Sequence, residues 1–327
     1  MTPPSHVIGV DVGATKIAAG LVRFPEGRVL ERNRIPTCPD RDPEQVLNDL
    51  FEMVAALAQR ARARSIAVEG IGMGVCELVD PKGELLSHHS LHWTSARIRE
   101  RLGALAPVFL DADVRAGGRA EALFGEGRGR GCFVYVTIGT GISSCLLIDG
   151  VPFVGARGAT GTFASSAVAP RCPSCGESSS RTLEDWASGA GLTQRARVEA
   201  QLDVDRAEDL LARADAGDLR AVAVVQSGAE AVGRAIAWLV DTLDPEVVVI
   251  GGGLGLRGGR YWNTLVSAAQ QSFWSDLHRG IPILPAATGV DAGLLGAAAL
   301  AWDHLGQATR APSGFASAPH IKSATRR

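Results

Sequence analysis

The feature that most constrains the fold is an apolar run near the N-terminus that stops at a glycine turn and then resumes. Residues 7–17 read VIGVDVGATKI, and apolar sequence continues to Val22. Runs of β-branched residues on both sides of a glycine turn predict two tightly joined strands. Free N–H groups in such a turn attract an anion, and Thr15 and Lys16 add a hydroxyl and a positive charge. Asp11, at the end of the first strand, is suited to hold Mg²⁺ or its water molecules. The alternative is an ordinary hairpin in which these residues serve only the turn.

A second strand–turn–strand unit has a similar composition. Residues 133–138 read as a strand that runs into Gly139-Thr140-Gly141, and apolar sequence returns at residues 145–148. Asp149-Gly150 then predicts a two-residue hairpin. One Gly-Thr-Gly turn is weak evidence, but two hairpins with glycine and threonine at their tips could hold a polyphosphate from two sides.

Length and charge exclude several classes of protein. A chain of 327 residues can form two domains, each with its own core. A formal net charge of −2 gives no electrostatic case for nucleic acid or an anionic membrane as the main partner. No apolar run reaches the ~18 residues of a membrane span, and residues 1–6 do not form a signal peptide. Six scattered cysteines do not make a disulfide framework, so the reducing cytoplasm is the expected location.

Glycine interrupts two further predicted strands. Gly70, Gly72 and Gly74 alternate with apolar residues in the strand predicted over residues 65–75 and leave one face without side chains. Either a ligand or a closely packed helix can occupy that face. Gly251-Gly252-Gly253 follows a buried strand predicted over residues 247–250, where glycine lets a planar ring or a phosphate lie against the backbone.

Apolar spacing predicts long helices over residues 43–64, 228–243 and 291–302. Asp42 is suited to cap the first of them, and Pro43 suits its first turn. From about residue 307 the chain lacks periodicity, which predicts a disordered tail over residues 307–327.

Two loops carry candidate polar residues. Asp113 follows a strand predicted over residues 108–110, at the sheet edge where α/β proteins bind ligands. It is either a helix cap or a base that removes a hydroxyl proton. Residues 85–93 contain His88, His89 and His92, but neither a helical ligand pair nor a cysteine accompanies them, so a polar loop is expected.

In order and spacing, these motifs resemble the ROK family of sugar kinases and repressors, which share a two-lobed actin/hexokinase-like (ribonuclease-H-like) α/β fold. The resemblance runs from Val7 to about Ala301. Repressor members carry a DNA-binding segment before the first strand, and only residues 1–6 precede it here, so the kinase branch is expected. The matching segments are residues 11–16, 138–142, 155–161, 184–189 and 251–253.

The resemblance implies an N-terminal lobe over residues 1–115 and a C-terminal lobe over residues 116–306, with the active-site cleft between them. The last helix, about residues 291–305, is expected to pack back on the first lobe. Family members commonly assemble through the second lobe, so a homodimer or a higher homo-oligomer is expected.

The implied chemistry is phosphoryl transfer from ATP, with Mg²⁺, to a sugar hydroxyl. Asp113 would take the hydroxyl proton, and Gly252 and Gly253 would lie against the adenosine. The phosphate and metal roles would fall on Asp11, Gly13, Ala14, Thr15, Lys16, Gly139, Thr140 and Gly141.

The acceptor side departs from the family pattern. The usual Asn-Asp-x-Asn reads Ala112-Asp113-Val114-Arg115, and Gly-Glu-x-Gly-His becomes GTFAS at residues 161–165. Each lost hydrogen bond to a sugar is worth about 0.5–3 kcal/mol, so an acceptor other than glucose or an N-acetylhexosamine is expected. The candidate acceptor contacts are His89, Ser90, Ala112, Arg115, Thr162 and Glu184, of which Glu184 is the retained family residue.

Arg115 has three interpretations. It could pair with Asp113 and lower its pKa, bind an anionic group of the substrate, or face solvent on a helix turn.

The zinc site of the family is altered as well. Ser165 stands for its histidine and Thr182 for its third cysteine, which leaves Cys172 and Cys175. Two thiols are half of a tetrahedral site, so no structural zinc is expected.

Two functions remain. The first is an ATP-dependent carbohydrate kinase with an altered acceptor pocket, for an unusual sugar, a polyol or a sugar acid. The second is a nucleotide-binding sensor or pseudo-kinase, which the replaced acceptor residues favour. Retention of Asp113 and Glu184 favours the kinase.

Overall fold

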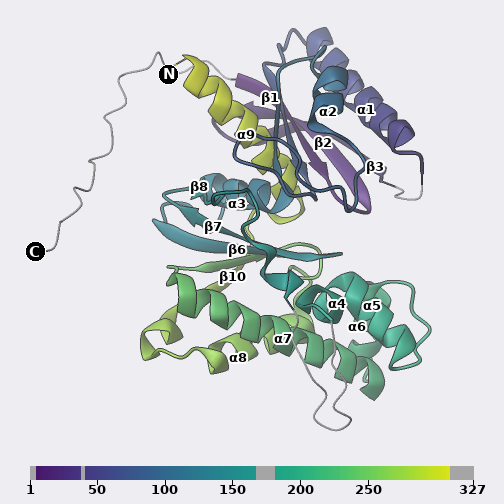
Figure 1. The fold of residues 1–327 in the computed structure, drawn as a ribbon, viewed down its shortest axis with the longest axis vertical. Coiled ribbons are helices and arrows are strands. Elements are labelled where there is room, and N and C mark those ends of the chain that lie inside the picture. The colour runs from purple at the N-terminus through teal and green to yellow at the C-terminus, as the bar shows by residue number, and fades with distance from the viewer. Residues whose placement is uncertain (1–4, 38–40, 167–180, 310–327) are drawn as a thin grey trace, which may run out of the picture.

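The computed structural model describes residues 5–37, 41–166 and 181–309, and these form two α/β lobes (Figure 1). The first lobe contains a five-stranded sheet in the order β3-β2-β1-β4-β5. Its strand β1 pairs antiparallel with β2 and parallel with β4. The strands are β1 (Ser5–Val12), β2 (Lys16–Phe24), β3 (Arg28–Pro36), β4 (Gly70–Val75) and β5 (Val108–Ala112).

The second lobe repeats this arrangement. Its five-stranded sheet has the order β10-β9-β6-β7-β8, and β6 pairs antiparallel with β7 and parallel with β9. The two glycine turns predicted from the sequence are the β1–β2 and β6–β7 turns, so they occupy equivalent places in the two sheets. The strands are β6 (Cys132–Ile138), β7 (Ile142–Ile148), β8 (Val151–Pro152), β9 (Val248–Gly251) and β10 (Ile283–Pro285).

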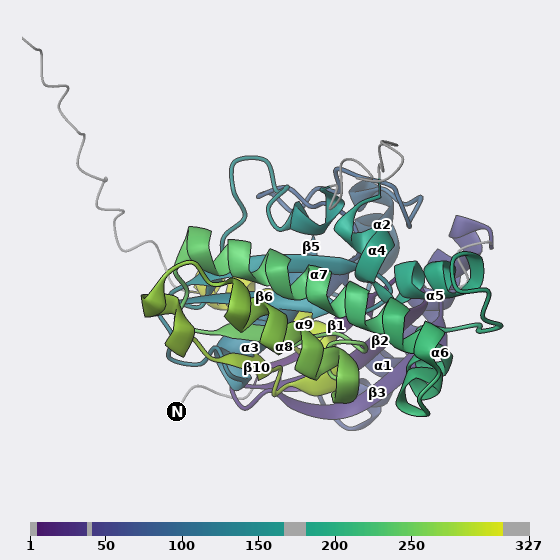
Figure 2. The same ribbon diagram turned by 90° about the horizontal axis from the view of Figure 1, so that it is seen from below.

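Helices cover both sheets. α1 (Pro43–Ala63) and α2 (Ser95–Leu102) pack on one face of the first sheet, and α3 (Asp113–Phe124) and α9 (Ala292–Thr309) lie between the two sheets (Figure 1). From below, α7 and α8 lie side by side under the second sheet (Figure 2). The helices of the second lobe are α4 (Leu183–Ala187), α5 (Gly189–Val198), α6 (Ala207–Asp215), α7 (Leu219–Leu243) and α8 (Gly259–Ser272).

Local capping explains where two of these helices begin. The carboxylate of Asp42 accepts a hydrogen bond from the N–H of Glu44, which confirms the predicted start of α1. α7 begins nine residues earlier than the predicted helix over residues 228–243, because Asp218 caps it through the N–H groups of Arg220 and Ala221. An aspartate before a helix satisfies N–H groups that lack an intrahelical partner.

The glycine face of β4 is occupied by a helix. A Cβ atom on Gly72 would lie 1.7 Å from the carbonyl oxygen of Ala297, and one on Gly9 would lie 2.1 Å from that of Leu294. The backbone of α9 therefore rests directly on β1 and β4. Close helix packing, rather than a ligand, explains the alternating glycines, and the last helix packs on the first lobe as expected.

α9 continues to Thr309, so residues 307–309 of the predicted tail are helical. The rest of that segment, residues 310–327, lies outside the described residues. Among the helices that the structure describes, none is long and apolar enough to cross a membrane.

Candidate active site

A cleft of about 1070 Å³ is lined by residues from both lobes. The β1–β2 turn and β5 contribute from the first lobe, and the β6–β7 turn and α4 contribute from the second. The lining includes every residue singled out as a site candidate from the sequence: Asp11, Gly13, Ala14, Thr15, Lys16, His89, Ser90, Ala112, Asp113, Arg115, Gly139, Thr140, Gly141, Thr162, Glu184, Gly252 and Gly253.

The first glycine turn is closed by its own backbone and held by a threonine. Gly13 N–H donates to Lys16 O at 3.0 Å, and the side chains of Thr15 and Lys16 are exposed. The Thr37 hydroxyl donates to Gly13 O at 2.7 Å, and its N–H donates to Thr15 O at 3.1 Å. Thr37 was not predicted as part of the site, because a single threonine after a strand belongs to no recognisable motif.

The second glycine turn is held from the side of α4 and α5. Gly139 N–H donates to Gly141 O at 2.9 Å, and Gly189 N–H donates to Gly139 O at 2.8 Å. Glu184 accepts a hydrogen bond from Ile142 N–H at 2.7 Å. One oxygen of Glu184 is thus used to hold the turn, and its expected contact with the acceptor stays a prediction.

Asp113 and Asp11 are two carboxylates that line the cleft. Asp113 is the first residue of α3; the N-cap is Ala112, so Asp113 is not the cap. Burial, with the negative charge of Asp11, raises the pKa of Asp113 to about 7. Burial also raises the pKa of Asp11 to about 6, although Lys16 opposes this increase. Two partly buried carboxylates with raised pKa values in one cleft are typical of a functional site.

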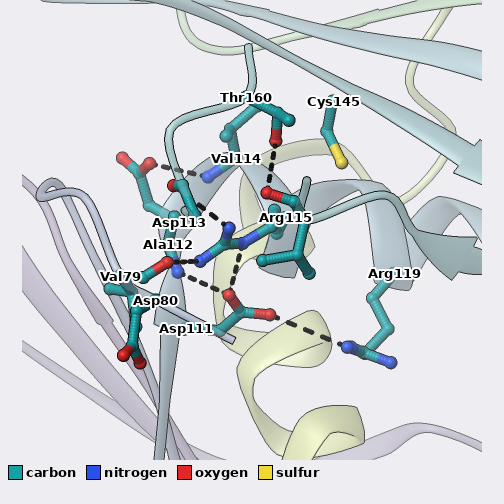
Figure 3. Close-up of polar contacts among 12 residues, drawn as sticks. Val79, Asp80, Asp111, Ala112, Asp113, Val114, Arg115, Arg119, Cys145 and Thr160 are labelled. Atoms are coloured by element: carbon teal, nitrogen blue, oxygen red, sulfur yellow. Dashed lines mark hydrogen bonds and ion pairs between the residues drawn. The ribbon is translucent and has the colours of Figure 1, made fainter. Parts of the chain in front are cut away.

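The structure contradicts two of the three interpretations of Arg115, the solvent-facing side chain and the direct pair with Asp113. The side chain of Arg115 is 3% exposed, so it does not face solvent. Its Nε donates to Asp111 Oδ1 at 2.5 Å, and not to Asp113 (Figure 3). The positive charge of Arg115 still lowers the pKa of Asp113, but burial and Asp11 outweigh it. Asp111 was not predicted as a site residue, because it lies at the end of an apolar strand and belongs to no recognisable motif.

The loop with the three histidines is organised by Glu77, another residue that was not predicted as part of the site. Its carboxylate accepts hydrogen bonds from the N–H groups of His89, Ser90 and Leu91, at 2.6–3.0 Å, and from the Ser87 hydroxyl. Burial would raise the pKa of Glu77, but these hydrogen bonds outweigh it and lower the pKa. Glu77 therefore stays ionised and fixes the backbone of His89 and Ser90 at the cleft.

The two glycines after β9 have different surroundings. Gly252 has φ +81°, and a Cβ atom there would lie 2.4 Å from Ile138 O. A Cβ atom on Gly253 would meet no atom within 4 Å. Gly252 is required by the packing of β9 against the second turn, whereas Gly253 leaves the wall of the cleft open for a flat ligand.

Residues related to the family's zinc site have other contacts. Thr182 caps α4 in a capping box with Asp185, and Thr162 and Ser165 lie in a short 3₁₀ helix (Thr162–Ser165). Cys172 and Cys175 lie outside the described residues. Within the described ranges, no group of three or more histidine, cysteine, aspartate or glutamate side chains is arranged to hold a metal ion.

The fold and the cleft define an α/β protein of the actin/hexokinase-like class, and comparison with known proteins defines the family. Residues 7–304 match the ROK family, so the chain belongs to it. The ROK hexokinase of Thermus thermophilus is 32% identical, with a TM-score of 0.74 over 92% of this chain and 99% of that one. A ROK glucokinase of Streptomyces griseus, solved with glucose and AMPPNP, is 28% identical, with a TM-score of 0.77 over 91% of this chain and all of that one.

A curated relative extends the comparison. The N-acetylmannosamine kinase of Shigella flexneri is 29% identical over 300 residues, which are 90% of this chain and 98% of that protein. These relatives are sugar kinases, and the chain is similar to them over nearly its whole described length.

Proposed function

We propose that this chain is a kinase that transfers the γ-phosphoryl group of ATP to a hydroxyl of a sugar or sugar-like acceptor, with Asp113 as the general base. The observation that carries this proposal is that Asp113 lines the same cleft as the two glycine turns. Its pKa of about 7 is near physiological pH, where a base both ionises and accepts a proton efficiently. The kinase names of the relatives support the same reaction.

The phosphate side of the cleft fits a nucleoside triphosphate. Two turns with backbone N–H groups face the cleft from opposite lobes, and Lys16 adds a positive charge. We assign the adenosine to the open wall beside Gly253, where a Cβ atom would meet no neighbour. Such a site catalyses mainly by positioning the reactants and neutralising charge.

Asp11 fits a role in holding Mg²⁺. Its carboxylate lies in the cleft, and burial raises its pKa to about 6, partly opposed by the positive charge of Lys16. Mg²⁺ commonly uses one or two carboxylates together with substrate phosphates and water. When bound, Mg²⁺ would neutralise charge on the phosphates, and Asp11 would hold it there.

The cleft is lined by more acidic than basic side chains. The acidic residues are Asp11, Glu77, Asp113, Glu184, Asp185 and Glu199, the basic ones are Lys16, Arg115, Arg181 and Arg195, and Arg115 is paired with Asp111. This balance supports an uncharged hydroxyl compound over a sugar acid as the acceptor, because an anion would be repelled there.

The first test is an ATP-consumption assay against a panel of hexoses, amino sugars, polyols and sugar acids. We expect turnover with a neutral acceptor. The Asp113→Asn protein should lose about 10²–10⁴-fold in rate, since the amide cannot accept the hydroxyl proton. Tight ATP binding by calorimetry without turnover on any acceptor would instead favour the nucleotide-binding sensor.

A further inference from the structure

We propose that Arg115 is a positioning residue that ties the turn carrying Asp113 to one loop from each lobe and so keeps the acceptor side of the cleft assembled. This role rests on the proposed kinase function for its effect on catalysis. Its structural part can be measured without any substrate.

The contacts of the guanidinium define the tie (Figure 3). Arg115 Nη2 donates to Val79 O, in the loop after β4, at 2.6 Å. Arg115 Nη1 donates to Gly158 O, in the loop after β8, at 3.4 Å. Arg115 Nε donates to Asp111 at the end of β5. One side chain therefore joins three segments that are far apart in the sequence.

The two loops touch at the place where Arg115 holds them. Gly158 has φ +74°, and a Cβ atom there would lie 2.2 Å from Val79 O. Val79 and Gly158 are both buried residues, and Arg115 donates a hydrogen bond to the carbonyl oxygen of each. A buried carbonyl that loses its donor is destabilised. Because Gly158 and Thr160 line the cleft, a shift of this contact changes the shape of the acceptor side.

The charge of Arg115 is already compensated within the protein. Asp111 Oδ1 accepts from Arg115 and from the N–H of Ala112, and Asp111 Oδ2 lies 3.7 Å from Arg119. Arg119 in turn pairs with Asp303 of α9 at 2.9 Å. A buried guanidinium with these partners is suited to hold backbone, and not to bind a mobile anion. Lysine cannot replace it fully, since an ammonium group lacks the planar fork that reaches three acceptors at once.

Hydrogen exchange of the free protein tests the structural part. We compare wild type, Arg115→Ala, Arg115→Lys and the matched control Arg119→Ala, which alters the same helix and the same aspartate but touches neither loop. Exchange should become faster at residues 78–83 and 155–161 in both Arg115 variants, and stay at the wild-type rate there in Arg119→Ala. Unchanged exchange of both loops in Arg115→Lys, the variant more certain to fold, would overturn the proposal.

The effect of Arg115 on catalysis is tested by steady-state kinetics with the acceptor that the ATP-consumption assay identifies. Arg115→Ala should lower kcat/KM for the acceptor about 10–100-fold, as displaced reacting groups do, and should leave KM for ATP within about twofold. Added guanidinium ion should restore part of this loss to Arg115→Ala and nothing to Arg119→Ala. A loss that follows only the fraction of folded protein, without rescue, would show a merely structural residue and contradict the proposal. Absence of turnover in the wild type would count against the kinase and leave the hydrogen-exchange test intact.

Discussion

At Asp113, folding disfavours the ionised form of the side chain, because the carboxyl group is buried close to Asp11. In an unfolded chain its carboxyl group ionises near pH 3.8, whereas burial and Asp11 raise its pKa in the folded protein to about 7. The folded state therefore holds a proton that the unfolded state releases between these two values. Stability is highest below the unfolded pKa and falls as the pH rises to about 7.

This sign leads to a prediction that needs no substrate. Asp113→Asn should be more stable than wild type at pH 8, by about 1–4 kcal/mol, because each pKa unit corresponds to about 1.4 kcal/mol and an amide does not ionise. The difference should vanish near pH 4. Chemical unfolding at pH 4, 6 and 8 measures it, with the exposed Asp276→Asn as a control that stays near zero. A stability difference that is constant with pH would contradict the burial of Asp113.

Site residues that belong to motifs could be predicted from the sequence, whereas the residues that hold them in place could not. Asp11, Lys16, Asp113 and the glycines of both turns carry recognisable patterns, and all of them line the cleft. Glu77 and Asp111 were missed, although each is buried and holds part of the site. The partners of Glu77 are backbone N–H groups and a hydroxyl 10–14 residues away, and Asp111 pairs with Arg115 four residues on, across the junction of β5 and α3, so neither carboxylate belongs to a recognisable motif.

At the scale of elements, glycine decides how closely α9 approaches the first sheet. β1 and β4 present Gly9 and Gly72 to the backbone of α9, and no side chain separates them. The alternating glycines were visible in the sequence, but they are equally consistent with a ligand or a closely packed helix on that face of the strand. The helix that fills it lies more than 200 residues away along the chain.

Gly72→Ala tests this packing. The added Cβ atom would lie 1.7 Å from Ala297 O and must displace α9, so we expect a loss of about 1–3 kcal/mol or more in the free energy of unfolding. Gly280→Ala is the control, because a Cβ atom there meets nothing within 4 Å. Urea unfolding of both variants gives the comparison. Equal stability of the two variants would show that the contact between α9 and β4 is not tight.

At the scale of the whole molecule, α3 and α9 cross between the two sheets. A Cβ atom on Gly296 of α9 would lie 1.6 Å from Ala116 O of α3. The helix that carries Asp113 and Arg115 is thus packed directly on the helix that covers the first sheet. Occupancy of the cleft by a ligand should therefore stabilise both lobes together.

A non-hydrolysable ATP analogue with Mg²⁺ should raise the melting temperature of the protein. Ligand binding to the folded state alone adds about 2.7 kcal/mol at a concentration 100 times its Kd. Lys16→Ala should reduce the increase, since Lys16 is exposed at the tip of the first turn and supplies charge for the phosphates. Thermal unfolding by circular dichroism measures both proteins. An equal increase in melting temperature for wild type and Lys16→Ala would show that Lys16 does not contribute to nucleotide binding.

Several expectations at this scale stay predictions. They are the lobe boundary at residues 115 and 116, the homo-oligomeric state, the cytoplasmic location and the absence of a structural zinc. Light scattering and metal analysis of the purified protein test the second and the fourth.

The sequence by itself determined the features that depend on neighbours in the chain. The cap of α1, the hairpin at Asp149-Gly150 and the two glycine turns follow from conformations and hydrogen bonds within a few residues. The family resemblance added the two-lobed fold and the proposed role of Asp113. Tertiary structure alone decided that α9 fills the glycine face, that Glu77 holds the histidine loop and that Arg115 reaches Val79 and Gly158. These contacts depend on packing between segments distant in the sequence, where burial and the need of every buried polar group for a partner select one arrangement.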